Sequence, residues 1–240
     1  MARLTRKELK KDPFLSVYYD DFVEFAQKNY RPLIGVVVLA GLVVVAAYSW
    51  KNYEQRQELV ANTLLGTALN TFRAYVGPTP EGESAPGEQT FGTPAEKYRA
   101  ALKQFSEVVQ NYPRQKAAQI ALYHVGICQA ELGNSGIAVN TLEQAVRASD
   151  PNIAALARLA LADELARTGK LEAAESLYTQ LANHPTQTVP AATAWLDLAN
   201  AERSTQPAAA RQIYQRLAKD YGSDTYLAET VKEQLSTLPK

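Results

Sequence analysis

His124 and Cys128 are the two residues of this sequence whose types and spacing come closest to a chemical site. They are four residues apart, so on a helix they share one face, where a soft metal or a thiolate–imidazole pair would find its first two ligands. The only other histidine, His184, lies far along the chain, and there is no second cysteine. Because cysteine also behaves as a small buried apolar residue, we expect both side chains to pack between helices.

Other patterns of enzyme chemistry are missing from the sequence. It has no phosphate-cradling glycine loop, no CxxC and no HExxH. The 25 basic and 25 acidic residues give a formal net charge of zero, whereas nucleic-acid-binding proteins usually carry a basic excess. We therefore predict that the chain is not an enzyme, has no catalytic residue, cofactor or metal, and does not bind nucleic acid.

An uncharged apolar run, residues 32–50, predicts a transmembrane helix. A helix from Tyr30 to Trp50 is about 30 Å long, the thickness of a bilayer core. Four aromatic residues are predicted at the membrane interfaces: Tyr30 at one end, and Tyr48, Trp50 and Tyr53 at the other. A cleaved signal peptide is the alternative, although 31 residues precede the run, which is long for a signal peptide.

The distribution of basic residues predicts the orientation of this span. Seven Lys and Arg residues precede it, and two, Lys51 and Arg56, lie in the 20 residues that follow. The side richer in Lys and Arg stays in the cytoplasm. We therefore predict a single-pass protein of the inner (cytoplasmic) membrane, with a cytoplasmic N-terminus and a periplasmic C-terminal domain.

The tail before the span, residues 1–31, carries an apolar stripe. Phe14, Tyr18, Phe22 and Phe25 recur at spacings of four, four and three, which predicts an amphipathic helix on the cytoplasmic membrane surface. Such a helix is either a docking element for a membrane partner or a passive anchor.

Residues 51–240 contain an internal repeat. Four segments align on an alanine, a large residue four positions later and an apolar residue three further on; these are Ala101, Phe105 and Val108; Ala138, Leu142 and Ala145; Ala174, Tyr178 and Leu181; and Ala210, Tyr214 and Leu217. The intervals of 36 and 37 residues, with glycines before two of the alanines, resemble the tetratricopeptide repeat. We predict an all-α chain: an N-terminal transmembrane helix followed by a TPR-like α-solenoid of helical hairpins. The fourth unit departs from the pattern, with Thr205 and Pro207 where a turn glycine is expected.

Two further segments belong to this domain. Residues 77–93 are dense in Gly, Pro, Ser and Glu, which predicts a flexible loop. Residues 225–238 carry Leu227, Val231 and Leu235 on one helical face, which predicts a capping helix.

The surface of the repeats gives weaker signals. Tetratricopeptide domains that hold chaperone tails use a clamp of Lys, Arg and Asn, and none of the six matching positions carries one; these are Tyr123, Ile127, Leu159, Asp163, Ala192 and Leu196. We therefore expect an apolar, weakly polar binding face. Because Tyr, Trp and Arg are common interface anchors, the predicted protein-binding residues are Gln119, Tyr123, Arg158 and Trp195.

The whole layout, with the run NYPRQKAAQIALYHVGICQAELG, resembles a family of bacterial single-span TPR-like inner-membrane proteins, the YfgM-like ancillary subunits of the Sec (SecYEG) translocon. The family motif matches at Tyr112–Pro113 and Ala117–Ala121. The resemblance implies a periplasmic scaffold that contacts the translocon and periplasmic chaperones. A scaffold for another envelope machine (pilus, secretion, division or outer-membrane assembly) is the alternative, and a metal or enzyme site at His124 and Cys128 is a third hypothesis. The sequence predicts no oligomeric state.

Overall fold

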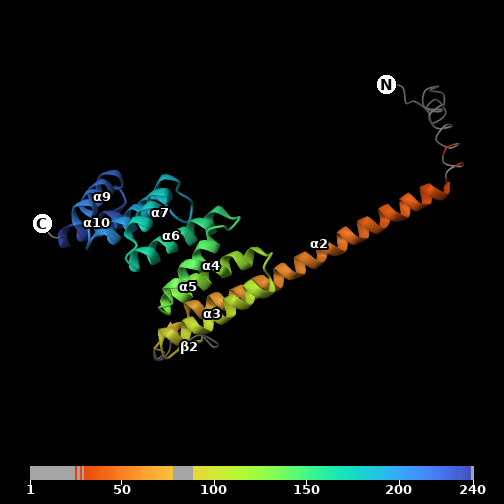
Figure 1. Cartoon of the computed structure of the whole chain (residues 1–240), viewed down its shortest axis with the longest axis horizontal. Coiled ribbons are helices and arrows are strands. Elements are labelled where there is room, and N and C mark those ends of the chain that lie inside the picture. Colours follow the sequence, from red (N-terminus) through yellow and green to blue (C-terminus); the bar gives the residue numbers. More distant parts are fainter. Residues whose placement is uncertain (1–24, 26–27, 29, 78–88, 239–240) are drawn as a thin grey trace, which may run out of the picture. The chain divides into compact units, whose positions relative to one another are not determined.

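The computed structural model describes residues 25, 28, 30–77 and 89–238. Within them the chain is helical apart from one pair of two-residue strands (Figure 1). The elements in order are α2 (Tyr30–Arg73), β1 (Tyr75–Val76), β2 (Thr90–Phe91), α3 (Pro94–Asn111), α4 (Lys116–Glu131), α5 (Ser135–Ala145), α6 (Pro151–Arg167), α7 (Leu171–Asn183), α8 (Ala191–Glu202), α9 (Pro207–Asp220) and α10 (Thr225–Thr237). The predicted tail helix lies outside the described residues except for Phe25.

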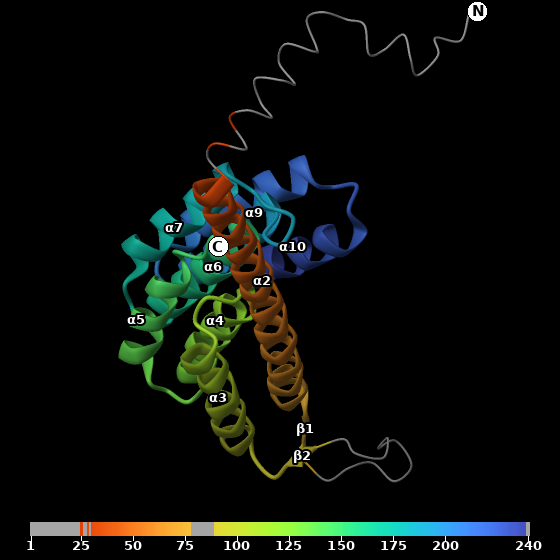
Figure 2. The ribbon, with the colours of Figure 1, turned by 90° about the vertical axis from the view of Figure 1, so that its right-hand side faces the viewer.

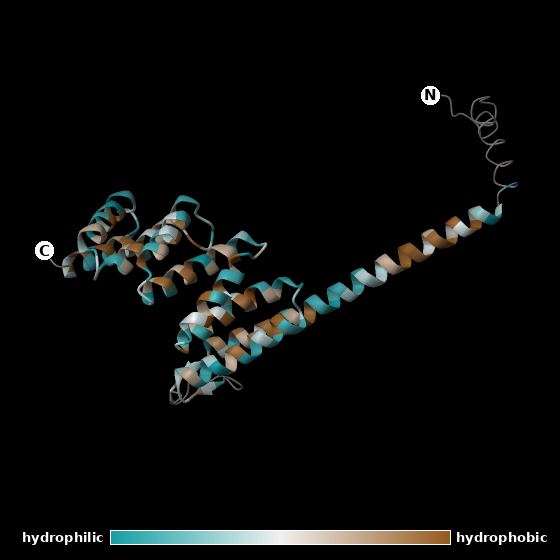
Figure 3. Ribbon diagram, in the orientation of Figure 1, coloured by the Kyte–Doolittle hydropathy of each residue, from teal (hydrophilic) through white to brown (hydrophobic). Residues whose placement is uncertain are grey.

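The chain divides into two compact units, Met1–Arg56 and Gln57–Lys240. Helix α2 begins in the first unit and ends in the second. Its N-terminal half carries the apolar run, seen as the brown band in Figure 3. By length and composition this part of α2 could cross a membrane, and none of its apolar window is buried. A signal sequence near the N-terminus would have the same properties.

The second unit is a stack of helical hairpins, as the sequence predicts. The hairpins pair the C-terminal part of α2 with α3, α4 with α5, α6 with α7 and α8 with α9, and α10 packs on α9. All twelve aligned repeat residues are at most 2% exposed. The small alanine at the first aligned position lets the second helix of each hairpin approach closely, and the large residue four positions on fills the core.

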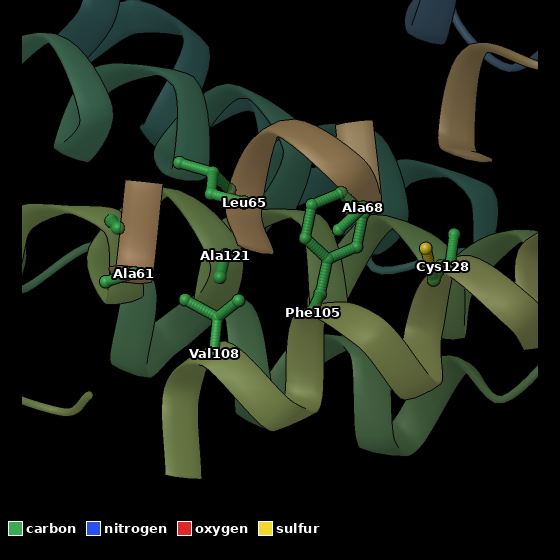
Figure 4. Close-up of a cluster of buried hydrophobic side chains, with 9 residues drawn as sticks. Ala61, Leu65, Ala68, Phe105, Val108, Ala121 and Cys128 are labelled. Atoms are coloured by element: carbon green, nitrogen blue, oxygen red, sulfur yellow. The ribbon is translucent and has the colours of Figure 1, made fainter. Parts of the chain in front are cut away.

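The first core cluster joins α2 to α3 and α4 (Figure 4). Ala61, Leu65 and Ala68 of α2 lie against Phe105 and Val108 of α3. The helix that contains the apolar run therefore also supplies the first helix of the repeat stack.

The ends of the hairpin helices follow from local residues. Thr93 and Glu96 form a capping box at the start of α3, and Asp150 caps α6 before Pro151. Gly133 and Gly169 end α4 and α6 with φ of 79° and 81°, a conformation that glycine adopts without strain. The fourth hairpin turns without a glycine: Gln206 donates its N–H to the carbonyl of Glu202 over 2.7 Å, and Pro207 opens α9.

The segment predicted as a loop, residues 77–93, follows one short strand, β1, and contains another, β2. Tyr75 and Val76 pair in parallel with Thr90 and Phe91 (Figure 2). These two strands were not predicted from the sequence. Residues 78–88 lie outside the described part of the chain. The division of the chain at residues 31, 50 and 51 remains a prediction.

Candidate protein-binding face

The first helices of the last three hairpins lie next to one another. Helix α4 contacts α6, and α6 contacts α8. Each of these helices has a buried side and one side that is not covered by the rest of the stack. On the uncovered side stand Tyr123 of α4, Asp163 of α6, and Asp197 and Asn200 of α8, which we call the first-helix face.

The burial pattern along the helices supports this assignment. On α6, Asp163 is exposed while its neighbours Ala162 and Glu164 are buried. On α8, Asp197 is half-buried and Asn200 is exposed, whereas Leu198 and Ala199 are buried.

Electrostatic coupling indicates that three of these residues are neighbours. The negative charge of Asp163 adds to burial in raising the pKa of Tyr123. Burial, together with the charge of Asp163, raises the pKa of Asp197 to about 6. The first-helix face therefore places two carboxyl groups of adjacent helices within each other's field.

Buried tyrosines of the second helices hold two members of this face. The hydroxyl of Tyr178 on α7 donates to Oδ1 of Asp163 over 2.6 Å. The hydroxyl of Tyr214 on α9 donates to Oδ1 of Asn200, also over 2.6 Å. The adjacent helices remove part of the water around Asp163 and raise its pKa, while the hydrogen bond from Tyr178 lowers it.

The four predicted protein-binding residues have different environments, and no observation tests their role. Tyr123 lies on the first-helix face. The side-chain amide of Gln119 donates to the hydroxyl of Ser149 over 3.0 Å and accepts the backbone N–H of Ser149 over 3.0 Å, so it holds the turn before α6. Arg158 lies five residues before Asp163, about 140° around the helix, and is half-buried.

Trp195 is half-buried and packs against three core clusters. Its ring packs against core clusters that include residues of α7 and α9, and the guanidinium carbon of Arg216 lies 5.0 Å from the ring centroid. The structure thus brings Tyr123 close to Asp163, and both Tyr123 and Trp195 border the core cluster between α6 and α8.

Asp197 and Asn200 were not among the predicted binding residues. The alignment of the repeats placed Leu196, one residue before Asp197, at a clamp position. The sequence feature that could have identified Asp197 is its spacing of 34 residues from Asp163, which is the length of one tetratricopeptide unit.

His124 and Cys128 lie in the first core cluster and its surroundings. The imidazole stacks on Phe105 with ring centroids 4.8 Å apart and meets Phe72 edge-on at 5.0 Å. Burial, with the nearby positive charge of Arg73, lowers the pKa of His124 to about 4. Burial raises the pKa of the fully buried Cys128 thiol to about 12, so the thiolate is not formed near neutral pH.

Metal ligands do not gather in the described part of the chain. It contains no group of three or more His, Cys, Asp or Glu residues that could hold a metal ion. His184 lies at the C-cap of α7, away from His124.

The predicted interfacial aromatic residues all project from α2 without cover. Tyr30, Tyr48, Trp50 and Tyr53 are between 52% and 74% exposed. Their positions at the two ends of the apolar run suit an interfacial role, which stays a prediction.

The comparisons with known proteins support the repeat fold. The tetratricopeptide repeat family matches residues 193–223, which span α8, α9 and the start of the next turn. The match falls on the unit that departs from the glycine pattern. Comparison with curated proteins and with solved structures gives no significant match, so no named relative confirms the resemblance to the translocon-associated family.

Proposed function

We propose that this chain is a membrane-anchored scaffold that binds partner proteins through its helical repeats. The observation that carries the proposal is the stack of hairpins with a tetratricopeptide match at residues 193–223, joined through α2 to an exposed apolar segment. Tetratricopeptide stacks present extended surfaces to other proteins and usually act as scaffolds.

The finer proposal concerns place and partners. The excess of Lys and Arg before the span supports a cytoplasmic N-terminus and an extracytoplasmic repeat domain. The resemblance to single-span TPR-like inner-membrane proteins supports a role in protein translocation or in hand-over to periplasmic chaperones. A scaffold for another envelope machine keeps the same fold and topology.

Crosslinking in the native membrane tests the scaffold. The tagged full-length protein is crosslinked, purified in mild detergent, and its crosslinked peptides are identified by mass spectrometry. Crosslinks from α4, α6 or α8 to translocon subunits or periplasmic chaperones are the expected result. Crosslinks to a pilus, secretion or division complex favour the alternative. Recovery of the protein alone contradicts the scaffold itself.

Cysteine labelling tests the orientation of the chain in the membrane, because the wild-type chain should give no labelling of its own. Cys128 is the only cysteine and is fully buried, so the unmodified chain should not react with a membrane-impermeant maleimide. In spheroplasts, Lys232→Cys on the exposed side of α10 should be labelled, and Lys10→Cys in the tail should react only after lysis. The reverse pattern contradicts the proposed topology.

A further inference from the structure

The first-helix face has an uncompensated negative charge. Asp163 and Asp197 lie on adjacent helices, and the charge of Asp163 disfavours ionisation of Asp197. The two ion pairs within the described residues, Arg167 with Glu164 and Arg216 with Asp220, involve neither of them. In a chain with no net charge, this face is therefore a local acidic surface.

No Lys or Arg contributes to the pKa shifts of the two carboxylates. The hydroxyl of Tyr123 on α4 and the hydroxyl of Tyr178 on α7 both lie within the field of Asp163. A cation that approached this face would meet the two carboxylates without displacing a partner of the protein itself.

Tyr178 fixes one of the carboxylates in advance. Its ring is buried at 2% exposure, and its hydroxyl binds only Oδ1 of Asp163. The second oxygen of Asp163 is left for a donor from outside. A carboxylate that is already oriented loses little conformational freedom when it binds.

The spacing of the helices defines the form of the ligand. Packed helices are about 8–10 Å apart, and an extended chain advances about 3.3 Å per residue. Tyr123 on α4 and Asp197 on α8 are separated by two helix steps, which about six residues of extended chain would span. An extended segment can thus contact all three helices.

We propose that the first-helix face binds an extended segment of a partner protein through a Lys or Arg side chain placed between Asp163 and Asp197, with the Tyr123 ring against a neighbouring residue of that segment. The proposal rests on the scaffold function and names the chemistry of its partner. The first-helix face is opposite in charge to a clamp of Lys, Arg and Asn, which binds a carboxylate.

A peptide selection tests the proposal. The full-length protein is inserted into nanodiscs of phosphatidylcholine, a lipid without net charge, and a random dodecapeptide display library is selected against it. The expected result is a family of peptides that shares one Lys or Arg. The most enriched peptide, labelled with fluorescein, is then titrated by fluorescence anisotropy against the wild-type chain and three variants.

The variants separate the face from general charge effects. Asp163→Asn and Asp197→Asn should each weaken binding at least tenfold, as should replacing the shared basic residue of the peptide with Gln. Asp220→Asn, which removes the same charge from the exposed surface of α9, should change binding less than twofold. Unchanged circular dichroism checks that each variant is folded.

The pH dependence of peptide binding provides a second readout. Because the pKa of Asp197 is raised to about 6, binding should weaken as the pH falls from 7.5 to 5. Selection of no peptide, of acidic or purely apolar peptides, or of binders unaffected by both Asp variants overturns the proposal. If crosslinking still recovers partners through another surface, the scaffold function stands and only the assigned chemistry fails.

Discussion

At the scale of single residues, Gly126 shows how tightly the second hairpin is packed. A Cβ at this position would lie 2.6 Å from both Cγ and Cδ2 of Leu142, and Leu142 is itself fully buried. Because Cγ is one of the two close atoms, a rotation of the terminal methyl groups alone would not relieve the contact. The absence of a side chain at Gly126 is therefore what allows α4 and α5 to meet at this distance.

We expect Gly126→Ala to destabilise the repeats by about 1–3 kcal/mol, the usual range for overpacking a core. Gly66→Ala is the matched control, because nothing lies within 4 Å of a Cβ at Gly66 and alanine favours a helix interior by roughly 0.5–1 kcal/mol. Thermal unfolding in detergent, followed by circular dichroism, should move in opposite directions for the two variants. A shift of the same sign in both contradicts the packing argument.

Tyr178 and Tyr214, which occupy the same position in successive repeats, allow a comparison of two hydroxyl hydrogen bonds. Both lose a hydroxyl hydrogen bond when changed to Phe, but Tyr178 donates to a carboxylate and Tyr214 to an amide. A bond to a charged group contributes about 1.5–3 kcal/mol and a neutral one about 1 kcal/mol. Asp163 is partly solvated, so the lower part of the charged range applies.

The pH dependence distinguishes the two bonds. The bond from Tyr178 favours the ionised form of Asp163 and lowers its pKa, so its contribution is present above that pKa and decreases as the pH falls through it. Tyr178→Phe should therefore lower the free energy of unfolding more at pH 8 than at pH 4. Tyr214→Phe should cause the same loss at both, as measured by urea unfolding. Equal pH profiles for the two variants exclude a charged acceptor.

At the scale of elements, the repeat helices were predictable and the binding surface was not. The positions that define the hairpins recur because each must fill the same space between helices, and Phe105, Leu142, Tyr178 and Tyr214 do so with different side chains. The surface has no such constraint. Gln119 and Trp195 were predicted as contacts, but one holds a turn and the other packs against α9.

The turns between helices also differ in how far the sequence predicts them. Gly133 and Gly169 signalled the ends of α4 and α6 because both adopt positive φ. The fourth hairpin uses backbone hydrogen bonds to Glu202 instead, so its sequence lacks the expected glycine. The short pairing of β1 with β2 joins residues on the two sides of segment 77–89, and no local pattern in the sequence predicts it.

Helix α10 ends the stack and carries a prediction of its own. Val231 is fully buried against α9, and Arg203 from the end of α8 donates to Gln234 over 2.8 Å and to Thr237 over 2.7 Å. Val231→Ala should destabilise this end of the stack by roughly 2 kcal/mol, mainly through the cavity that it leaves. Since repeats interact chiefly with their neighbours, hydrogen exchange should increase in α9 and α10 and remain unchanged in α3 and α4. Uniform faster exchange contradicts a local capping role.

At the scale of the whole molecule, two half-buried groups, His124 and Asp197, titrate with opposite effects on stability. The pKa of His124 is lowered to about 4 from an ordinary value near 6.5, so the unfolded chain binds its proton first and stability falls as the pH drops from 6.5 to 4. The pKa of Asp197 is raised to about 6, so the folded chain binds its proton first and stability rises over nearly the same range.

The two effects oppose each other, and single variants should reveal them. Each group contributes at most about 1.4 kcal/mol per pH unit. Asp197→Asn should make the repeats lose stability more steeply on acidification than the wild type, and His124→Gln should make them gain stability relative to it. Urea midpoints measured between pH 4 and 7 provide the slopes. Parallel slopes for the three proteins would mean that neither group changes its pKa on folding.

The continuity of α2 leads to the last prediction. The same helix carries the apolar run and, through Ala61, Leu65 and Ala68, part of the first core cluster. Cleavage after the run would leave this core intact, so folding of the repeats does not reveal whether the run is retained.

Retention as an anchor predicts that the chain resists extraction by alkaline carbonate and has an intact mass near 26.3 kDa. A soluble product that begins beyond residue 50 would identify the run as a signal sequence. A Leu39→Arg variant supplies the control, because a charge in the middle of the span disfavours insertion by about 3 kcal/mol and should raise the extractable fraction only if the run is an anchor.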